Sequence, residues 1–192
     1  MLSQTIKSYA PYFLLGFLIF LLHFSPLAWH ELLQYSRPAI GQGEVWRVLT
    51  GHLLHSNAYH LLMNMVGLLL IMLIHGHLPG RLAFGWQLLI LGLGTSAGLW
   101  WLAPDMLYYV GLSGVLHGIL CYGAVIDIKQ GFRTGYLILA GVLVKILSEQ
   151  FSAPDLALAA QINADVAIDA HLFGASVGCL LGLVLLSRTP RQ

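Results

Sequence analysis

Long apolar stretches are the feature of this sequence that most limits its fold. A helix that crosses the hydrocarbon core of a bilayer needs about 20 predominantly apolar residues. Six stretches come close to this length, at residues 11–29, 53–74, 82–102, 113–128, 135–150 and 168–186. No segment beside them is long enough for a soluble domain. We therefore predict an all-α membrane protein in which residues 1–192 form one domain of six transmembrane helices.

The charge composition agrees with a chain embedded in lipid. Charged residues make up 9% of the sequence, whereas soluble domains carry about 25%. A formal net charge of +1 does not favour binding to nucleic acid. Cys121 and Cys179 each lie within an apolar run and are predicted to be packing residues. We expect no nucleic-acid partner, no metal and no cofactor.

The basic residues predict the orientation of the helices, because Lys and Arg collect on the cytoplasmic side of a membrane. If both termini are cytoplasmic, the basic residues on that side are Lys7, Arg81, Lys129, Arg133, Arg188 and Arg191. Arg37 and Arg47 of the first loop then face outside. That loop is long and combines Trp46 with Arg47, a composition that suits the membrane interface.

A serine and a histidine on different predicted helices form the candidate site. Ser113 begins the fourth stretch within GLSGVLHG, and His171 lies early in the sixth within DAHLFG. Both stretches start on the outer side, so the two side chains are expected at similar depth. Small residues let helices approach closely in lipid, and both stretches carry glycines at intervals of four: Gly114 and Gly118, and Gly174, Gly178 and Gly182. If these stripes face each other, the imidazole can take the proton of the hydroxyl, as nucleophilic acyl chemistry requires.

The second stretch supplies candidate donors for the oxyanion that forms when an amide carbonyl is attacked. His60 and Asn64 are one helical turn apart and therefore share a face. Together with the backbone N–H of Ser113, they are predicted to form an oxyanion hole. Nearby His55 and Asn57 are expected instead to satisfy polar groups of a neighbouring loop.

In combination, these motifs resemble the rhomboid family of intramembrane serine proteases. GLSG, an Ala-His pair that opens a glycine-striped last helix, HxxxN in the second stretch and Trp-Arg in the first loop occur in the family's order. The resemblance implies a compact six-helix bundle with Ser113 as nucleophile, His171 as base, and the two polar residues of HxxxN as oxyanion donors. It also implies a bacterial inner membrane, an active site open toward the periplasm, and a membrane protein as substrate.

Finer features resemble the rhombosortase branch of that family. Rhomboids often carry a tyrosine one turn after the nucleophile, whose ring packs on the catalytic histidine, whereas this chain has His117 there. We predict that His117 packs on or bonds to His171, with Gly111 and Gly114 as further supporting residues. The resemblance implies a substrate with a C-terminal Gly-Gly signal (GlyGly-CTERM type), a transmembrane helix and a short basic tail.

The sequence predicts a Ser-His dyad, because it places no carboxylate clearly beside His171. Asp169 lies two residues earlier, on roughly the opposite face of a continuous helix, and is expected to be a solvated charge. Lys145 and Glu149 lie one turn apart in the fifth stretch and are assigned no catalytic role. An acyl-enzyme on Ser113 could be resolved by water or by an amine, so hydrolysis and transpeptidation both stay open.

Other interpretations use the same residues differently. His60 and His171 could ligate a haem at matching depth, although this gives Ser113 and Asn64 no role. WHELLQ, at residues 29–34, contains His-Glu but lacks the second histidine of the zinc-protease motif HExxH. A non-catalytic, client-binding rhomboid would generally lack the serine or the histidine, and both are present. A general rhomboid protease of single-span membrane proteins is the nearest alternative.

Overall fold

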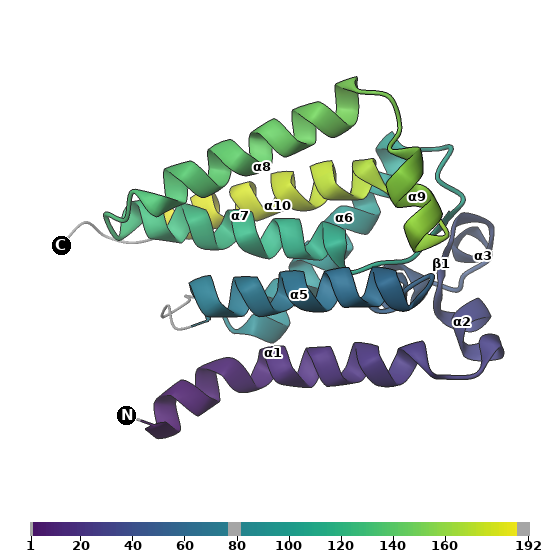
Figure 1. Cartoon of the computed structure of the whole chain (residues 1–192), viewed down its shortest axis with the longest axis horizontal. Coiled ribbons are helices and arrows are strands. Elements are labelled where there is room, and N and C mark those ends of the chain that lie inside the picture. The colour runs from purple at the N-terminus through teal and green to yellow at the C-terminus, as the bar shows by residue number, and fades with distance from the viewer. Residues whose placement is uncertain (1, 77–81, 188–192) are drawn as a thin grey trace.

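The computed structural model describes residues 2–76 and 82–187. Within them, six helices of 17 to 22 residues lie side by side (Figure 1). These are α1 (Leu2–His23), α5 (Ala58–His75), α6 (Phe84–Leu102), α7 (Ser113–Lys129), α8 (Thr134–Phe151) and α10 (Ile168–Ser187). The predicted all-α fold is confirmed, apart from one pair of very short strands.

Short elements connect the long helices at the end of the bundle where α7 begins. Between α1 and α5 lie α2 (Leu27–Leu33), α3 (Arg37–Gly41), α4 (Arg47–Thr50) and the 3-10 helix η1 (Gly51–Leu53). Helix α9 (Leu156–Ile162) lies between α8 and α10. Strand β1 (Tyr35–Ser36) pairs in antiparallel fashion with β2 (Tyr108–Tyr109). This pairing joins the first loop to the segment that precedes α7.

Helix α7 is the centre of the bundle. Almost every residue from Gly114 to Asp127 is buried, and the helix packs against α5, α6, α8 and α10. Its approach to α10 is the closest, because the carbonyl oxygens of Gly114 and Gly118 occupy the space that a Cβ atom would need at Gly174 and Gly178. The two glycine stripes therefore face each other, as small residues at helix crossings in lipid do.

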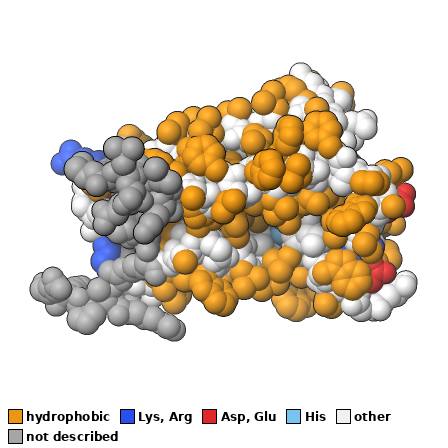
Figure 2. All heavy atoms as spheres, turned by 90° about the horizontal axis from the view of Figure 1, so that it is seen from below, with side chains coloured by type: hydrophobic (Ala, Val, Ile, Leu, Met, Phe, Trp, Pro, Cys, Tyr) orange, Lys and Arg blue, Asp and Glu red, His pale blue; other side chains and the backbone are white. Residues whose placement is uncertain are grey.

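The outer surface of the helices is apolar. Figure 2 views the bundle from the α1 side, where hydrophobic side chains cover most of the face and charged side chains appear near its two ends. On α1, the exposed residues include Phe13, Leu14 and Phe17. Among the described helices, three are long and apolar enough to cross a membrane: α5, α8 and, within α10, Ile168–Leu185. The bent pair α1 and α2 makes a fourth if it is counted as one span. These helices have the composition of an integral membrane protein.

Two predicted helix boundaries are wrong at the end where α7 begins. The first stretch was expected to run to residue 29, but α1 ends at His23 and the chain bends by 120° into α2. Pro26 follows the bend, and a proline disfavours helical geometry in the residue before it. The second stretch was expected to begin at residue 53, but α5 begins at Ala58, where the Asn57 side chain accepts a hydrogen bond of 2.9 Å from the His60 N–H.

Two groups of described basic residues, apart from Lys145 within α8, lie at the two opposite ends of the bundle. The start of α1, the end of α10 and the turn between α7 and α8, which carries Lys129 and Arg133, lie at one end (Figure 1). Arg81, Arg188 and Arg191 fall outside the described residues. At the other end, Arg37 donates hydrogen bonds to the Leu99 and Ala103 carbonyls at the end of α6. A cation near the C-terminus of a helix is favourable there.

Candidate active site

The Ser113 and His171 side chains meet between α7 and α10. The Nε2 atom of His171 lies 2.8 Å from the Oγ atom of Ser113. Ser113 is the first residue of α7, and His171 lies in the first turn of α10 with only 6% of its surface exposed. The close glycine contacts between these two helices thus bring a nucleophile and a base within hydrogen-bonding distance.

The backbone before Ser113 is fixed by Gly111. This residue has φ of +133°, a conformation that other residues rarely adopt, and a Cβ atom there would lie 2.9 Å from the His60 ring. The Gly111 N–H donates to the Gly51 carbonyl at 3.1 Å, and its own carbonyl accepts from the Tyr109 hydroxyl. These contacts set the entry of the chain into α7 and hence the direction of the Ser113 side chain.

A buried histidine supports that tyrosine from the first loop. The Nδ1 atom of His52 lies 3.2 Å from the Tyr109 oxygen, and Nε2 lies 3.0 Å from both the Gly92 carbonyl and the Ser96 hydroxyl. Burial lowers the pKa of His52 to about 4, so its ring is neutral at pH 7. His52 therefore connects η1, α6 and the segment before Ser113 through an uncharged network.

His117 packs flat against the candidate base. The His117 and His171 rings are stacked, with centroids 4.4 Å apart and planes inclined by 22°. The Nδ1–H of His117 donates to the Ser113 carbonyl at 2.8 Å, which fixes the orientation of the His117 ring. Stacked rings at this separation are favourable, so His117 restricts the positions available to the base.

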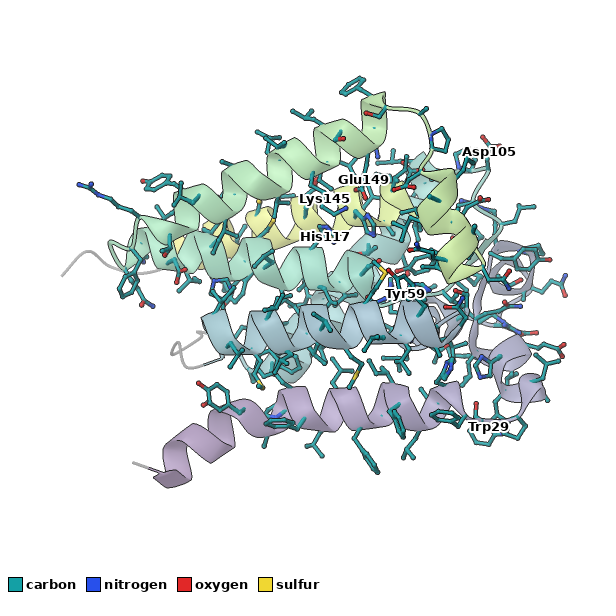
Figure 3. All side chains as sticks on the ribbon, in the orientation of Figure 1. Trp29, Tyr59, Asp105, His117, Lys145 and Glu149 are labelled. Atoms are coloured by element: carbon teal, nitrogen blue, oxygen red, sulfur yellow. The ribbon has the colours of Figure 1, made fainter. Side chains whose placement is uncertain are left out.

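A carboxylate contacts the other ring nitrogen of His171, contrary to the prediction that none does. Both carboxylate oxygens of Glu149 lie 3.0 Å from Nδ1 of His171. The Nζ atom of Lys145 lies 2.5 Å from Oε1 of Glu149. Figure 3 shows Lys145 and Glu149 of α8 near His117 of α7. Asp169 is directed elsewhere and accepts a hydrogen bond of 3.5 Å from Gln150.

Sequence reasoning missed Glu149 although a signal was present. Ionisable residues are costly inside a membrane helix and usually face the interior of the bundle. Lys145 and Glu149 are four residues apart, so they can pair and present the carboxylate inward. What the sequence does not contain is the rotation of α8 about its axis, which decides that Glu149 reaches α10.

His60 and Asn64 line a cavity of about 370 Å³ together with Ser113 and His171. The walls of this cavity are mainly apolar and include Met63, Gly67 and Leu70 of α5 and Leu116 and Leu120 of α7. Nδ2 of Asn64 donates to the His60 carbonyl at 3.0 Å, which uses one of its two hydrogens. The second hydrogen is available for a ligand in the cavity.

The hydrogen bonds of His60 favour a proton on Nδ1. The Ser56 hydroxyl lies 2.5 Å from the Ile162 carbonyl and donates its single hydrogen there. The Ser56 oxygen, 3.0 Å from Nδ1 of His60, is then an acceptor for that nitrogen. In this tautomer Nε2 of His60 carries no proton. His60 can donate to an oxyanion only if Ser56 turns its hydroxyl from Ile162 to Nδ1, or if the ring is protonated.

The remaining polar residues of this loop contact their neighbours, as expected for Asn57, whose Nδ2 donates to the Gln161 carbonyl at 2.8 Å. The same was expected of His55, but this prediction is wrong: both of its ring nitrogens are buried without a hydrogen-bond partner, and the ring lies edge-on against His60, with centroids 5.1 Å apart. Among the described residues, no group of three or more His, Cys, Asp or Glu side chains is arranged to hold a metal ion. Both ring nitrogens of His171 have protein partners, so the haem alternative would require breaking one of these contacts.

The chain is similar to known proteins over a region that contains the whole site. Residues 42–188 match the Rhomboid domain family. The chain is also similar to a protein of Bacillus subtilis (strain 168) named "Putative rhomboid protease YdcA". The two are 24% identical over 174 residues, which cover 88% of this chain and 81% of the relative. The family match includes every residue discussed above for the site, from Gly51 to His171.

Proposed function

Because this chain belongs to the rhomboid family, whose members are serine proteases acting on membrane proteins, we propose that it cleaves its substrate with Ser113 as nucleophile and His171 as base. The distance of 2.8 Å between Oγ of Ser113 and Nε2 of His171 carries this proposal. The pair is the minimum arrangement for acyl transfer by a serine. The chain is an enzyme of the hydrolase class.

The reaction follows from this geometry. Nε2 of His171 takes the hydroxyl proton as Oγ of Ser113 attacks the carbonyl carbon of the scissile amide. The tetrahedral intermediate collapses when the same proton passes to the leaving amine, which leaves an ester on Ser113. Water, deprotonated by His171, then attacks the ester; the ester C–O bond breaks as His171 returns this proton to Oγ of Ser113, and the new carboxylate is released. An amine in place of water gives transpeptidation.

The oxyanion of the intermediate is stabilised by donors from α7 and α5. The first N–H groups of a helix have no acceptor within it, which leaves the Ser113 N–H at the start of α7 as one donor. The second Nδ2 hydrogen of Asn64 is another. His60 contributes when its proton is on Nε2. The Ser113 N–H and the Asn64 amide are preorganised by their helices and need no rearrangement during the reaction.

We further propose that all six long helices cross a bacterial inner membrane, with both termini in the cytoplasm. The position of Lys129 and Arg133 at one end of the bundle supports this orientation. Ser113 and His171 lie toward the opposite end, where α7 and α10 begin. The active site then opens toward the periplasm, which supplies the water.

The substrate that we propose is an exported protein with a C-terminal Gly-Gly signal followed by a transmembrane helix, as for rhombosortases. Two glycines destabilise a helix and allow an extended backbone, which suits a narrow cavity whose walls are mainly apolar. His117, in the position where rhomboids often have tyrosine, supports this branch. A general rhomboid protease without preference for Gly-Gly is the alternative.

Labelling with a fluorophosphonate, which reacts with activated serines, tests the nucleophile. We expect labelling of the wild type and none of Ser113→Ala, whereas Ser148→Ala, at an exposed position of α8, should label normally.

Co-expression with a Gly-Gly-tailed substrate tests the specificity. Cleavage by the wild type but not by Ser113→Ala, lost when Gly-Gly becomes Leu-Leu, supports the branch. Cleavage of both substrates supports a general rhomboid protease. Mass spectrometry of the new C-terminus separates a free acid from an attached amine.

A further inference from the structure

The position of Glu149 extends the site beyond a serine and a histidine. We propose that Glu149 is a positioning residue that completes a Ser113–His171–Glu149 triad, with Lys145 holding the carboxylate in place. This inference rests on the proposed function of Ser113 and His171. Its evidence is the pair of 3.0 Å distances between the Glu149 oxygens and Nδ1 of His171, on the side of the ring opposite to Ser113.

The carboxylate selects the tautomer that a base needs. A carboxylate can only accept hydrogen bonds when it is ionised, so the proton of a neutral His171 lies on Nδ1. Nε2 then presents its lone pair to the Ser113 hydroxyl 2.8 Å away. When Nε2 takes the proton of Ser113, the positive imidazolium faces a negative group. Serine proteases with a buried aspartate gain both effects in the same way.

The other groups around His171 do not substitute for this carboxylate. His117 of α7 uses Nδ1–H for the Ser113 carbonyl, and His60 of α5 uses Nδ1–H for Ser56. Asp165 lines the same cavity, and Asp169 contacts Gln150. In the described part of the chain, no carboxylate other than Glu149 is hydrogen-bonded to the His171 ring.

Lys145 explains how a carboxylate is tolerated at this depth. The Glu149 side chain is only 15% exposed, whereas that of Lys145 is 49% exposed. An ion pair of this kind lowers the free energy of a buried carboxylate, and a long lysine stem can carry its charge toward the interface. The contact of Glu149 with His171 also ties α8 to α10. Helix α8 buries few other residues: Gly135, Val142 and Ile146.

The decisive comparison is Glu149→Gln against Asp169→Asn, which removes a nearby carboxylate that does not contact the ring. We expect Glu149→Gln to lower kcat and the fluorophosphonate labelling rate by about 100- to 10,000-fold, with KM changed by less than about 2-fold. Asp169→Asn should stay within about 3-fold of the wild type. Glu149→Asp, which keeps the charge on a shorter stem, should recover part of the loss.

The pH dependence separates positioning from a purely structural role. In Glu149→Asp, which keeps a weaker carboxylate contact, the acidic limb of the kcat/KM profile should move to lower pH, because the protonated ring is less well stabilised. In the wild type, ¹⁵N-histidine NMR should place the neutral His171 proton on Nδ1. This measurement needs no variant and holds even if Glu149→Gln fails to fold.

Each outcome decides between the two proposals. Labelling of folded Glu149→Gln at the wild-type rate, or a His171 proton on Nε2, overturns the triad and leaves the Ser113–His171 pair intact. Labelling that persists in Ser113→Ala overturns the proposed function itself. Equal loss in Asp169→Asn and Glu149→Gln would assign the effect to general electrostatics and also overturn the triad.

Discussion

The carbonyl oxygen of Gly114 lies in the space that a Cβ atom on Gly174 would occupy. This contact holds the backbones of α7 and α10 together one residue after Ser113 and three residues after His171. The distance between nucleophile and base therefore depends on an interface that has no room for a methyl group. In lipid, where burial of apolar surface gives helices little reason to associate, such close packing is a main source of affinity between them.

Replacing Gly174 by alanine should separate α7 from α10. Overpacking of a well-packed interface costs about 1–3 kcal/mol, and the displaced helix moves His171 away from Ser113. We expect Gly174→Ala to lower both the thermal unfolding temperature and the labelling rate of Ser113. Gly141→Ala is the matched control, because nothing lies within 4 Å of a Cβ atom at Gly141 on α8. A fully active and stable Gly174→Ala would contradict the importance of this contact.

Replacements of His117 should distinguish packing from hydrogen bonding. Phenylalanine keeps a flat ring against His171 but loses the 2.8 Å bond to the Ser113 carbonyl, whereas alanine loses both. If stacking is the main contribution, worth about 1 kcal/mol, His117→Phe keeps nearly full kcat and His117→Ala loses about 5-fold. Equal losses in the two variants would instead assign the role to the hydrogen bond. Kinetics of substrate cleavage, with unfolding temperatures as a check on folding, decide the question.

Most residues of the candidate site could be predicted from the sequence, whereas the contact of Glu149 and the bend after α1 could not. Ser113, His171, His60 and Asn64 could be recognised because polar groups are rare in apolar helices and each fell at a helix start or on one face. The facing glycine stripes followed from their four-residue interval. The contact of Glu149 with His171 depends on the rotation of α8 about its own axis. Because most of the surface of α8 is apolar and exposed, its sequence does not indicate which face is turned toward α10. The bend after His23 was missed because apolar residues lie on both sides of Ser25 and Pro26, so that the first stretch was predicted to continue to residue 29.

Asn64 and Asn57, both near the start of α5, should respond differently to alanine. Asn64→Ala removes a proposed oxyanion donor, and loss of one such donor costs about 100- to 1000-fold in kcat. Asn57→Ala removes the cap on the His60 N–H and the bond to the Gln161 carbonyl. A lost cap costs about 1 kcal/mol of stability. We expect Asn64→Ala to change kcat with little effect on unfolding, and Asn57→Ala to do the reverse. A kcat unchanged in Asn64→Ala would remove this residue from the oxyanion hole.

The buried His52 predicts that the protein loses stability in mild acid. Burial lowers its pKa from the ordinary histidine value of 6.5 to about 4 in the folded protein. Between these two values the unfolded chain binds more protons than the folded one, so the free energy of unfolding falls as the pH falls. The contribution is fully present above about pH 6.5 and is progressively lost down to about pH 4, at up to about 1.4 kcal/mol for each pH unit.

Thermal unfolding in detergent at several values between pH 7.5 and pH 4.5 measures this effect. His52→Gln keeps hydrogen-bonding capacity without a titrating ring, so its unfolding temperature should be lower at pH 7.5 but should fall less steeply toward pH 4.5. His30→Gln, at a surface position of α2, controls for the removal of a histidine. Parallel curves for the wild type and His52→Gln would show that His52 is not the group that responds to acid, and the neutral network beneath Tyr109 would then need another explanation.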